Sequence, residues 1–263
     1  GVKHKALANA EDGEIIDAMK KSMWDMFESG TTHFIDYREG GIKGVELLRK
    51  ASKNLPVTPV ILGRDDSFYG QNPDLRKVKI AIRKLLKLAD GIALSGFGEI
   101  SDEVASLITS ECRKAGKISS IHVAESMHLQ DDSLRDFNKT EIQRGVDADF
   151  DQLVHCTNPR NNDLELIKNS NVVVCPRANA TLNVGVAPLN EMFSKGIKPL
   201  LGSDNLMLNS PNLFRELEFS LKIMSVYYKN YLNPKDLLKT ATTNICNFEI
   251  NRYIKKPVID VNQ

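Results

Sequence analysis

Three short segments beyond residue 120 end in side chains that could bind a metal ion and move protons. They are Ile121-His-Val-Ala-Glu125, Leu153-Val-His-Cys156 and Leu200-Leu-Gly-Ser-Asp-Asn205. In the first segment, strand alternation places His122 on the face opposite its apolar neighbours, and Glu125 falls where the strand runs out into a loop. A histidine with a carboxylate one step above it suits a metal ligand beside a proton shuttle.

Each of these polar residues also has a purely structural explanation. A single strand histidine, such as His122 or His155, is more often a hydrogen-bonded core residue than a ligand, and a strand-end aspartate such as Asp204 often caps the next element. The spacing His-x-x-Glu is also common by chance. The three segments are stronger evidence for a site together than singly, because each carries its polar residue at the carboxyl end of an expected strand. Parallel barrels place their active sites there.

Alternating strands and helices would bring these strand ends together. Seven strands are expected, over residues 31–37, 57–62, 91–95, 118–123, 152–156, 172–175 and 199–203. Helices are expected between them and over residues 14–29, before the first strand. This order predicts parallel βαβ units, and we expect a (β/α)8 barrel of the TIM type. An open doubly wound sheet is the alternative, although no Gly-x-Gly-x-x-Gly follows a strand to support a dinucleotide-binding version.

Charge and cysteine usage narrow the classes of partner. Lys plus Arg (35) nearly balance Asp plus Glu (34), so we expect neither nucleic acid nor an acidic membrane as a partner. No apolar run reaches the roughly 20 residues that a membrane-spanning helix needs. The four cysteines form no Cys-x-x-Cys pair, which predicts reduced thiols and a cytoplasmic protein.

In these three segments the sequence resembles the amidohydrolase superfamily, and within it the branch of cytosine deaminases and chlorohydrolases. The resemblance also rests on Val174-Cys-Pro-Arg-Ala-Asn179 and Gly185-Val-Ala-Pro188, and it covers roughly residues 11 to 248. It implies one divalent ion, Zn²⁺ or Fe²⁺. A second ion is not expected, because the strand over residues 91–95 is not followed by the lysine that bridges two metals in binuclear members.

The resemblance implies a role for each polar residue of the late strands. His122 and Asp204 would bind the metal, and Asp204 would also take a proton from the attacking water. His155 would hold that water or the substrate, and Glu125 would carry protons. We further expect Arg177 and Asn179 to contact the substrate, because a guanidinium suits bidentate contacts with anionic or carbonyl groups.

Two parts of the family pattern are missing from the sequence. The first-strand His-x-His motif has no counterpart, since His4 and His33 stand alone, and the family's small β-sandwich is also absent. We therefore expect residues 1–248 to form the hydrolase barrel without its first strand, with residues 249–263 as a C-terminal segment of uncertain structure. With only two ligands, the chain alone should bind metal weakly or not at all and be inactive.

The expected activity of the full-length protein is hydrolysis of a non-peptide C–N bond, with deamination of a cyclic amidine-like small molecule by a metal-activated water as the favoured case. A homodimer is left open. A metal-free barrel that serves as a binding or assembly module is the alternative. A phosphate-binding barrel isomerase or lyase ranks last, because Gly185 and Gly202 supply too few glycines for a phosphate loop.

Overall fold

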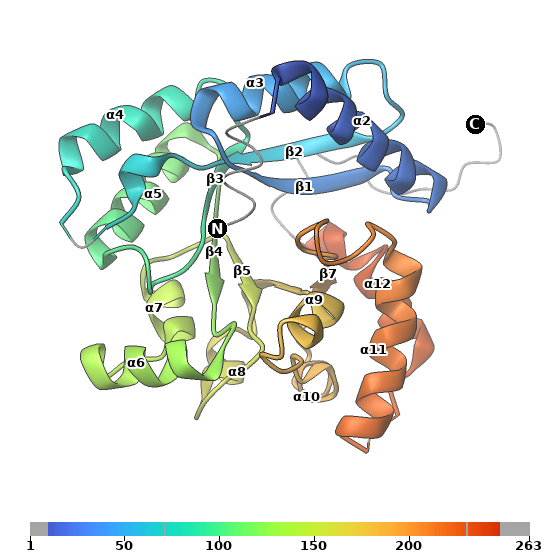
Figure 1. The fold of residues 1–263 in the computed structure, drawn as a ribbon. Coiled ribbons are helices and arrows are strands. Elements are labelled where there is room, and N and C mark those ends of the chain that lie inside the picture. The colour runs from blue at the N-terminus through green and yellow to red at the C-terminus, as the bar shows by residue number, and fades with distance from the viewer. Residues whose placement is uncertain (1–9, 71, 230, 248–263) are drawn as a thin grey trace.

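The computed structural model describes residues 10–70, 72–229 and 231–247, and Figure 1 shows their arrangement. The segment over residues 249–263 and His4 lie outside these described residues. Seven parallel strands form one sheet in the order β1-β2-β3-β4-β5-β6-β7. Their bounds are β1 (His33–Arg38), β2 (Thr58–Gly63), β3 (Gly91–Leu94), β4 (Ile118–Val123), β5 (Gln152–His155), β6 (Asn171–Val174) and β7 (Leu200–Leu201).

The strand order decides between the two expected architectures. Each strand pairs with the next along the chain, whereas a doubly wound sheet reverses its order at a switch point. The sheet curls into a half-barrel with helices on its outer side (Figure 1). All seven expected strands are present, and the α/β architecture is that of a partial TIM barrel.

Nine helices match expected helical segments. They are α2 (Asp12–Glu28), α3 (Gly41–Ser52), α4 (Leu75–Leu85), α5 (Asp102–Ala115), α6 (Met127–Phe137), α7 (Glu141–Asp147), α8 (Asp163–Leu166), α10 (Leu189–Ser194) and α11 (Leu213–Tyr227). The helical segment expected before Gly145 is split into α6 and α7, because Asn138 takes a left-handed φ of 53° and Thr140 caps the second helix. Two further helices, α9 (Pro176–Thr181) and α12 (Pro234–Thr240), and two 3-10 turns, η1 (Asp66–Phe68) and η2 (Asn244–Asn247), were not expected from the sequence.

The two faces of the sheet carry different side chains. On β4, Ile121 and Val123 pack into the main apolar core with the surrounding helices. On the opposite face, Ile118 joins a smaller apolar cluster with Val60 and Leu200, below the carboxyl ends of the strands. Alternation along β4 therefore points His122 to the inner face, as expected.

The expectations for membrane-spanning helices and for the cysteines can be compared with the described residues. None of their helices is long and apolar enough to cross a membrane. All four cysteines have free thiols, and three of them, Cys112, Cys156 and Cys175, are buried.

Candidate active site at the carboxyl ends of β4 to β6

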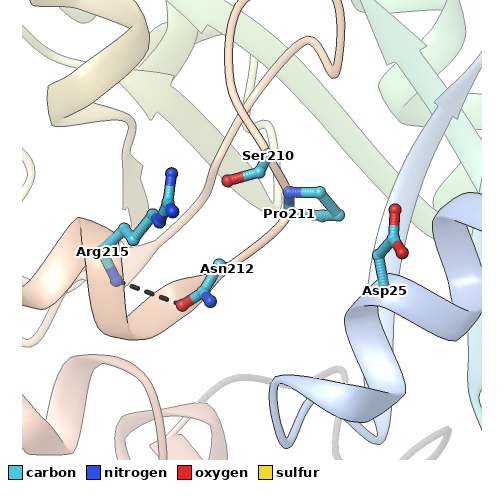
Figure 2. A pocket seen from close by; sticks show the side chains of 5 residues that line it. All are labelled: Asp25, Ser210, Pro211, Asn212 and Arg215. Carbon is cyan, nitrogen blue, oxygen red and sulfur yellow. Dashed lines mark hydrogen bonds between the residues drawn. The ribbon is translucent and has the colours of Figure 1, made fainter.

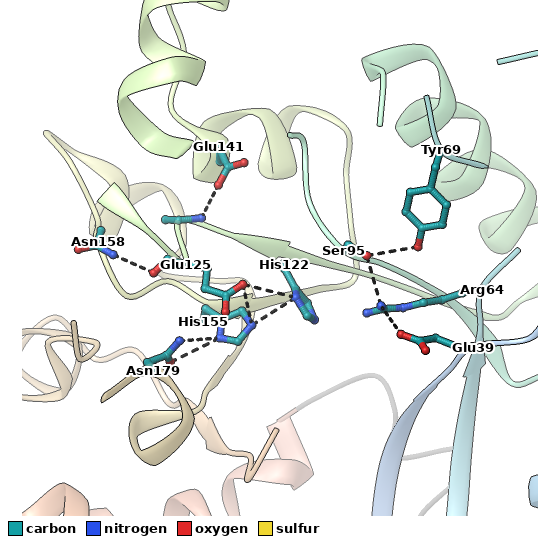
Figure 3. Close-up of polar contacts among 11 residues, drawn as sticks. Glu39, Arg64, Tyr69, Ser95, His122, Glu125, Glu141, His155, Asn158 and Asn179 are labelled. Carbon is teal, nitrogen blue, oxygen red and sulfur yellow. Dashed lines mark hydrogen bonds and ion pairs between the residues drawn. The ribbon is translucent and has the colours of Figure 1, made fainter. Parts of the chain in front are cut away.

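Three of the expected site residues meet at one point. His155 Nε2 lies 3.3 Å from His122 Nδ1, and the Glu125 carboxylate oxygen Oε2 lies 3.6 Å from the first atom and 3.9 Å from the second. Figure 3 shows the carboxylate facing both imidazoles. Among the described residues, these three form the one group of at least three potential ligand side chains whose atoms all lie within 4.8 Å of one another. Two imidazoles and a carboxylate are donors that Zn²⁺ accepts.

The pairing of β4 with β5 brings the two backbones together, and the positive φ of His155 turns its ring to the His122 side. His122 is in register with Val154, and Val123 is in register with His155, so the histidines lie one step apart on neighbouring strands. Their rings are 4.5 Å apart between centroids and nearly perpendicular, at 85°. His155 is fully buried, whereas the His122 side chain is 18% exposed, which leaves His122 the more accessible of the two.

Non-glycine residues with positive φ mark the ends of these strands. Ala124 has φ 51°, His155 75°, Cys156 46° and Asp204 56°. Residues other than glycine avoid this region, and when they occupy it they cluster at functional sites that the surrounding structure holds in place. The carboxyl edge of the sheet is therefore a strained part of the backbone.

Asn179 fixes the far side of the His155 ring. Its Nδ2 lies 3.1 Å from His155 Nδ1, and both side chains are fully buried. With Asn179 as the donor, a neutral His155 carries its proton on Nε2, directed at His122 and Glu125. Asn179 thus contacts the predicted catalytic histidine, and its predicted contact with substrate stays a prediction.

Asp204 follows β7 at the same edge of the sheet but is not a member of the His122–Glu125–His155 group. Its side chain is exposed. Its negative charge, after burial, helps to raise the pKa of the Cys175 thiol and of the Glu216 carboxyl. Metal binding by Asp204 therefore stays a prediction.

Arg177 is engaged with α11. Its Nη1 lies 3.3 Å from Glu216 Oε1, its backbone N–H donates to Glu216 Oε2 over 3.3 Å, and its side chain is 14% exposed. Burial raises the pKa of Glu216 from 4.5 to about 7, and the backbone N–H and charge of Arg177 oppose that rise. The predicted substrate contact of Arg177 would thus compete with a buried ion pair.

Sequence reasoning missed a polar cluster from β1 that lies against the histidines. The Tyr37 ring contacts His122 with centroids 5.3 Å apart, and its hydroxyl hydrogen-bonds Ser120 and accepts from Gln152 Nε2 over 2.9 Å. Arg64 lies over the same Tyr37 ring at 5.3 Å. Strand alternation could have identified Tyr37, Ser120 and Gln152 as inward-facing, although not as partners.

Arg64 continues this cluster along the mouth of the half-barrel. Its Nη1 donates to Ser95 Oγ over 3.2 Å and lies 3.9 Å from Glu39 Oε1, and the Tyr69 hydroxyl lies 3.3 Å from Ser95 Oγ (Figure 3). These side chains come from the loops after β1, β2 and β3.

A separate small pocket of about 190 Å³ lies between α2 and the start of α11. Figure 2 shows its lining residues, Asp25, Ser210, Pro211, Asn212 and Arg215. It contains no member of the histidine cluster.

Comparisons with known proteins agree with this arrangement. The sequence profile of the amidohydrolase family matches residues 8–248. A putative aminohydrolase of Methanothermobacter thermautotrophicus is 45% identical over 250 residues, covering 94% of this chain and 65% of that protein. A 5-methylthioadenosine/S-adenosylhomocysteine deaminase of Caldanaerobacter subterraneus is 31% identical over 133 residues, covering 47% of this chain and 31% of that protein.

Solved structures share the fold at low sequence identity. Atrazine chlorohydrolase from Arthrobacter aurescens, crystallised with zinc and atraton, superposes with a TM-score of 0.79 at 14% identity, covering 90% of this chain and 60% of that one. An adenosine deaminase from Xanthomonas campestris with bound zinc gives 0.75 at 14% identity, covering 91% and 58%. The chain thus spans just under two thirds of the length of the first relative and less of these structures. The profile match over most of its length shows that the chain belongs to the amidohydrolase family.

Proposed function

We propose that this chain supplies most of the catalytic barrel of a metal-dependent hydrolase that cleaves a non-peptide C–N bond and deaminates a cyclic amidine-like small molecule. The observation that carries the proposal is the meeting of His122, Glu125 and His155 within 4.8 Å at the carboxyl edge of a parallel sheet. Membership of the amidohydrolase family and the deaminases among its relatives support the same reaction class.

The donor set fits a divalent metal such as Zn²⁺ or Fe²⁺. In this proposal His122 and Asp204 would hold the ion together with the two further histidines that the family resemblance implies. β1 and β7 are the two ends of the sheet, so an additional strand between them would close the barrel. When bound, the metal would supply a hydroxide at neutral pH by lowering the pKa of a bound water to about 7.

The residues of this chain would handle the proton and the substrate. Glu125, which faces both rings at 3.6 and 3.9 Å, would carry a proton to the ring nitrogen or the leaving amine. His155 would orient the nucleophile, with its own ring fixed by Asn179. The near-balance of charge on the chain gives no reason to expect nucleic acid or an acidic membrane as a partner. The three buried free thiols agree with a reducing, cytoplasmic location.

Glu125→Gln in the full-length protein, meaning the complete gene product that contains these residues, tests the proposal. We expect ammonia release to fall by about 10²–10⁴-fold, since general acid–base catalysis contributes that much. Zinc or iron content by elemental analysis should not change. His128→Gln removes an exposed polar side chain three residues further on and should leave both readouts unchanged.

Three results would count against parts of the proposal. Unchanged turnover in Glu125→Gln would remove the proton-shuttle role. Loss of the metal together with turnover would make Glu125 a ligand. A full-length protein without stoichiometric metal and without an upstream His-x-His would favour the metal-free binding or assembly module instead.

A further inference from the structure

A buried group of polar side chains lies behind the turn that carries Glu125, and the proposed chemistry does not use it. We infer that Glu141 and Asn158 are positioning residues, which hold Ala124 in a left-handed conformation and so direct the Glu125 carboxylate toward His122 and His155. The inference rests on the proposed function for its kinetic test only, because the conformation of the turn can be measured without any activity.

Strand geometry shows why the turn must be held. On β4 the side chains alternate, with Ile121 and Val123 on the outer, helix-covered face and His122 on the inner face. Continued alternation through Ala124 would send Glu125 to the outer face as well. Instead Ala124 has φ 51°, and Glu125 lies on the same side as His122. The left-handed residue is therefore what brings acid and histidine together.

Alanine does not adopt this conformation without support. A residue with a Cβ is crowded by the carbonyl oxygen in the left-handed region, which glycine, and less often asparagine or aspartate, visits routinely. Ala124 is fully buried and cannot rely on water to satisfy its backbone groups. Hydrogen bonds to the surrounding protein must therefore hold the turn.

Glu141 supplies the bond on the amino side of the turn. It is the first residue of α7, it is 2% exposed, and its Oε2 accepts the Ala124 N–H over 2.9 Å (Figure 3). The backbone N–H of Phe97, in the loop after β3, also helps to lower the pKa of this carboxyl. Burial raises the pKa of the Glu141 carboxyl from 4.5 to about 7. The fold therefore places a carboxyl group at this position although its desolvation is unfavourable.

Asn158 supplies the bonds on the carboxyl side. Its Nδ2 donates to the carbonyl oxygens of Glu125 and Val184, each over 2.9 Å. The backbone N–H groups of Thr157 and Asn158 both donate to the Ala124 carbonyl, over 3.1 and 2.9 Å. The amide of Ala124 and the two carbonyls that follow it are thus all bonded.

Gln130 joins the two positioning residues into one unit. Its Oε1 accepts the Glu141 N–H over 2.8 Å, and its Nε2 donates to the Asn158 carbonyl over 2.9 Å and to Asp163 Oδ2 over 3.1 Å. Gln130 is fully buried. A change at Glu141 or at Asn158 should therefore alter the conformation of the same turn at Ala124.

The experiment compares Glu141→Gln with the double variant Glu141→Gln/Ala124→Gly in the full-length, metal-loaded protein. Glutamine keeps the shape but replaces one carboxylate oxygen with an NH₂ donor and removes the charge, so the bond to the Ala124 N–H is weakened or lost. We expect kcat to fall about 10–100-fold, as for a misplaced catalytic group, with KM within about 3-fold and metal content unchanged. Hydrogen exchange in the peptide over residues 122–127 should become faster.

Glycine at position 124 should restore part of both readouts, because glycine takes up positive φ without a steric cost. Glu111→Gln is the matched control: Glu111 is another buried glutamate, ion-paired with Arg83, but it lies on α5 in the helical layer. That variant should lower stability without changing kcat or exchange at residues 122–127.

Unchanged exchange over residues 122–127 in Glu141→Gln would overturn the inference, and so would equal effects in Glu111→Gln. Failure of Ala124→Gly to restore either readout would show that Glu141 acts by another route. If Glu141→Gln does not fold, Asn158→Ala is measured in its place, since it frees the Glu125 carbonyl and keeps the Glu141 bond. If the wild-type protein releases no ammonia, the proposed function fails and the exchange data alone decide the inference.

Discussion

The Arg177–Glu216 pair gives the sharpest test of the electrostatics near the site. Glu216 is fully buried on α11 and has two contacts with Arg177, one to the guanidinium and one to the backbone N–H. Arg177→Leu removes the first contact and keeps the second. Removing one partner of a buried pair is destabilising because the other charge stays uncompensated.

The pH dependence of this loss follows from the pKa of Glu216. Its value in the folded protein is about 7, above the ordinary 4.5, so the contribution of this carboxyl to stability falls as pH rises from 4.5 to 7 and is constant above that pH. Arg177 lowers this pKa, so Arg177→Leu must raise it further. Below pH 7 the folded carboxyl is protonated in both proteins. Above pH 7 the variant retains a proton that the wild type has released, which costs it up to about 1.4 kcal/mol per pH unit.

The magnitude can be stated at two pH values. At pH 6, Arg177→Leu loses the hydrogen bond from the guanidinium to the Ser210 carbonyl oxygen as well as the contact with Glu216, and it should lower the free energy of unfolding by about 2 kcal/mol. At pH 8 the protonation difference adds roughly 1 kcal/mol, so the total is about 3 kcal/mol, within the range for breaking a buried pair.

Urea unfolding of wild type and variant at pH 6 and pH 8 measures these values. In a protein that already carries Glu216→Gln, Arg177→Leu should lower the free energy of unfolding by the same amount at pH 6 and pH 8. Arg215→Leu, on the exposed side of the same helix, should change stability by less than about 0.5 kcal/mol. A deficit that is equal at both pH values, or smaller at pH 8, would refute the reasoning. A raised KM without any stability deficit would restore the substrate role for Arg177.

Two further predictions concern other buried positions. Asn179→Ala leaves His155 Nδ1 without its donor, so turnover of the full-length enzyme should fall about 10–100-fold in steady-state assays, and turnover restored in Asn179→Gln would show that the hydrogen bond, rather than side-chain volume, accounts for the fall. Gly91→Ala places a Cβ 2.1 Å from the Ile118 carbonyl oxygen and should cost at least about 2 kcal/mol in urea unfolding. Gly13→Ala, with no atom within 4 Å of the new Cβ, should instead stabilise α2 by up to about 1 kcal/mol, and equal effects of the two glycine substitutions would contradict this packing argument.

The elements were predictable where local physics decides them. Strands of a parallel sheet are buried on both faces, so a run such as Val172-Val-Val is apolar throughout and identifies β6. α5 begins at the N-cap Ser101 and ends at Gly116, which has φ 63°, and both signals are readable in the sequence. α9 carries no such pattern, because Pro176-Arg-Ala-Asn-Ala-Thr181 has no apolar stripe. The polar Asn179 is one of its buried residues instead.

The supports of the site were not predictable from spacing. Glu141 follows the N-cap Thr140, and an acidic residue in the first turn of a helix needs no other explanation than the helix dipole. Asn158 reads as an ordinary loop asparagine. Only the folded chain brings both to the turn at Ala124, across separations of 17 and 34 residues from that turn. Burial and hydrogen bonding at such distances leave no periodic signal.

The alternation rule itself fails at the site, and the failure has one cause. On β5, Gln152 contacts Tyr37 on the inner face and Leu153 packs in the outer core, so regular alternation would direct His155 outward, away from His122. His155 has φ 75°, and its ring instead lies on the inner side against His122 and Asn179. Glu125 is redirected in the same way by Ala124. Of the three side chains in the cluster, only His122 therefore reaches it by regular strand geometry, and the other two depend on left-handed residues that cost energy and must be held by their surroundings. A strand-end histidine or acid that regular alternation would place on the outer face is thus no argument against a site in a parallel barrel, provided that buried partners are present to hold the turn.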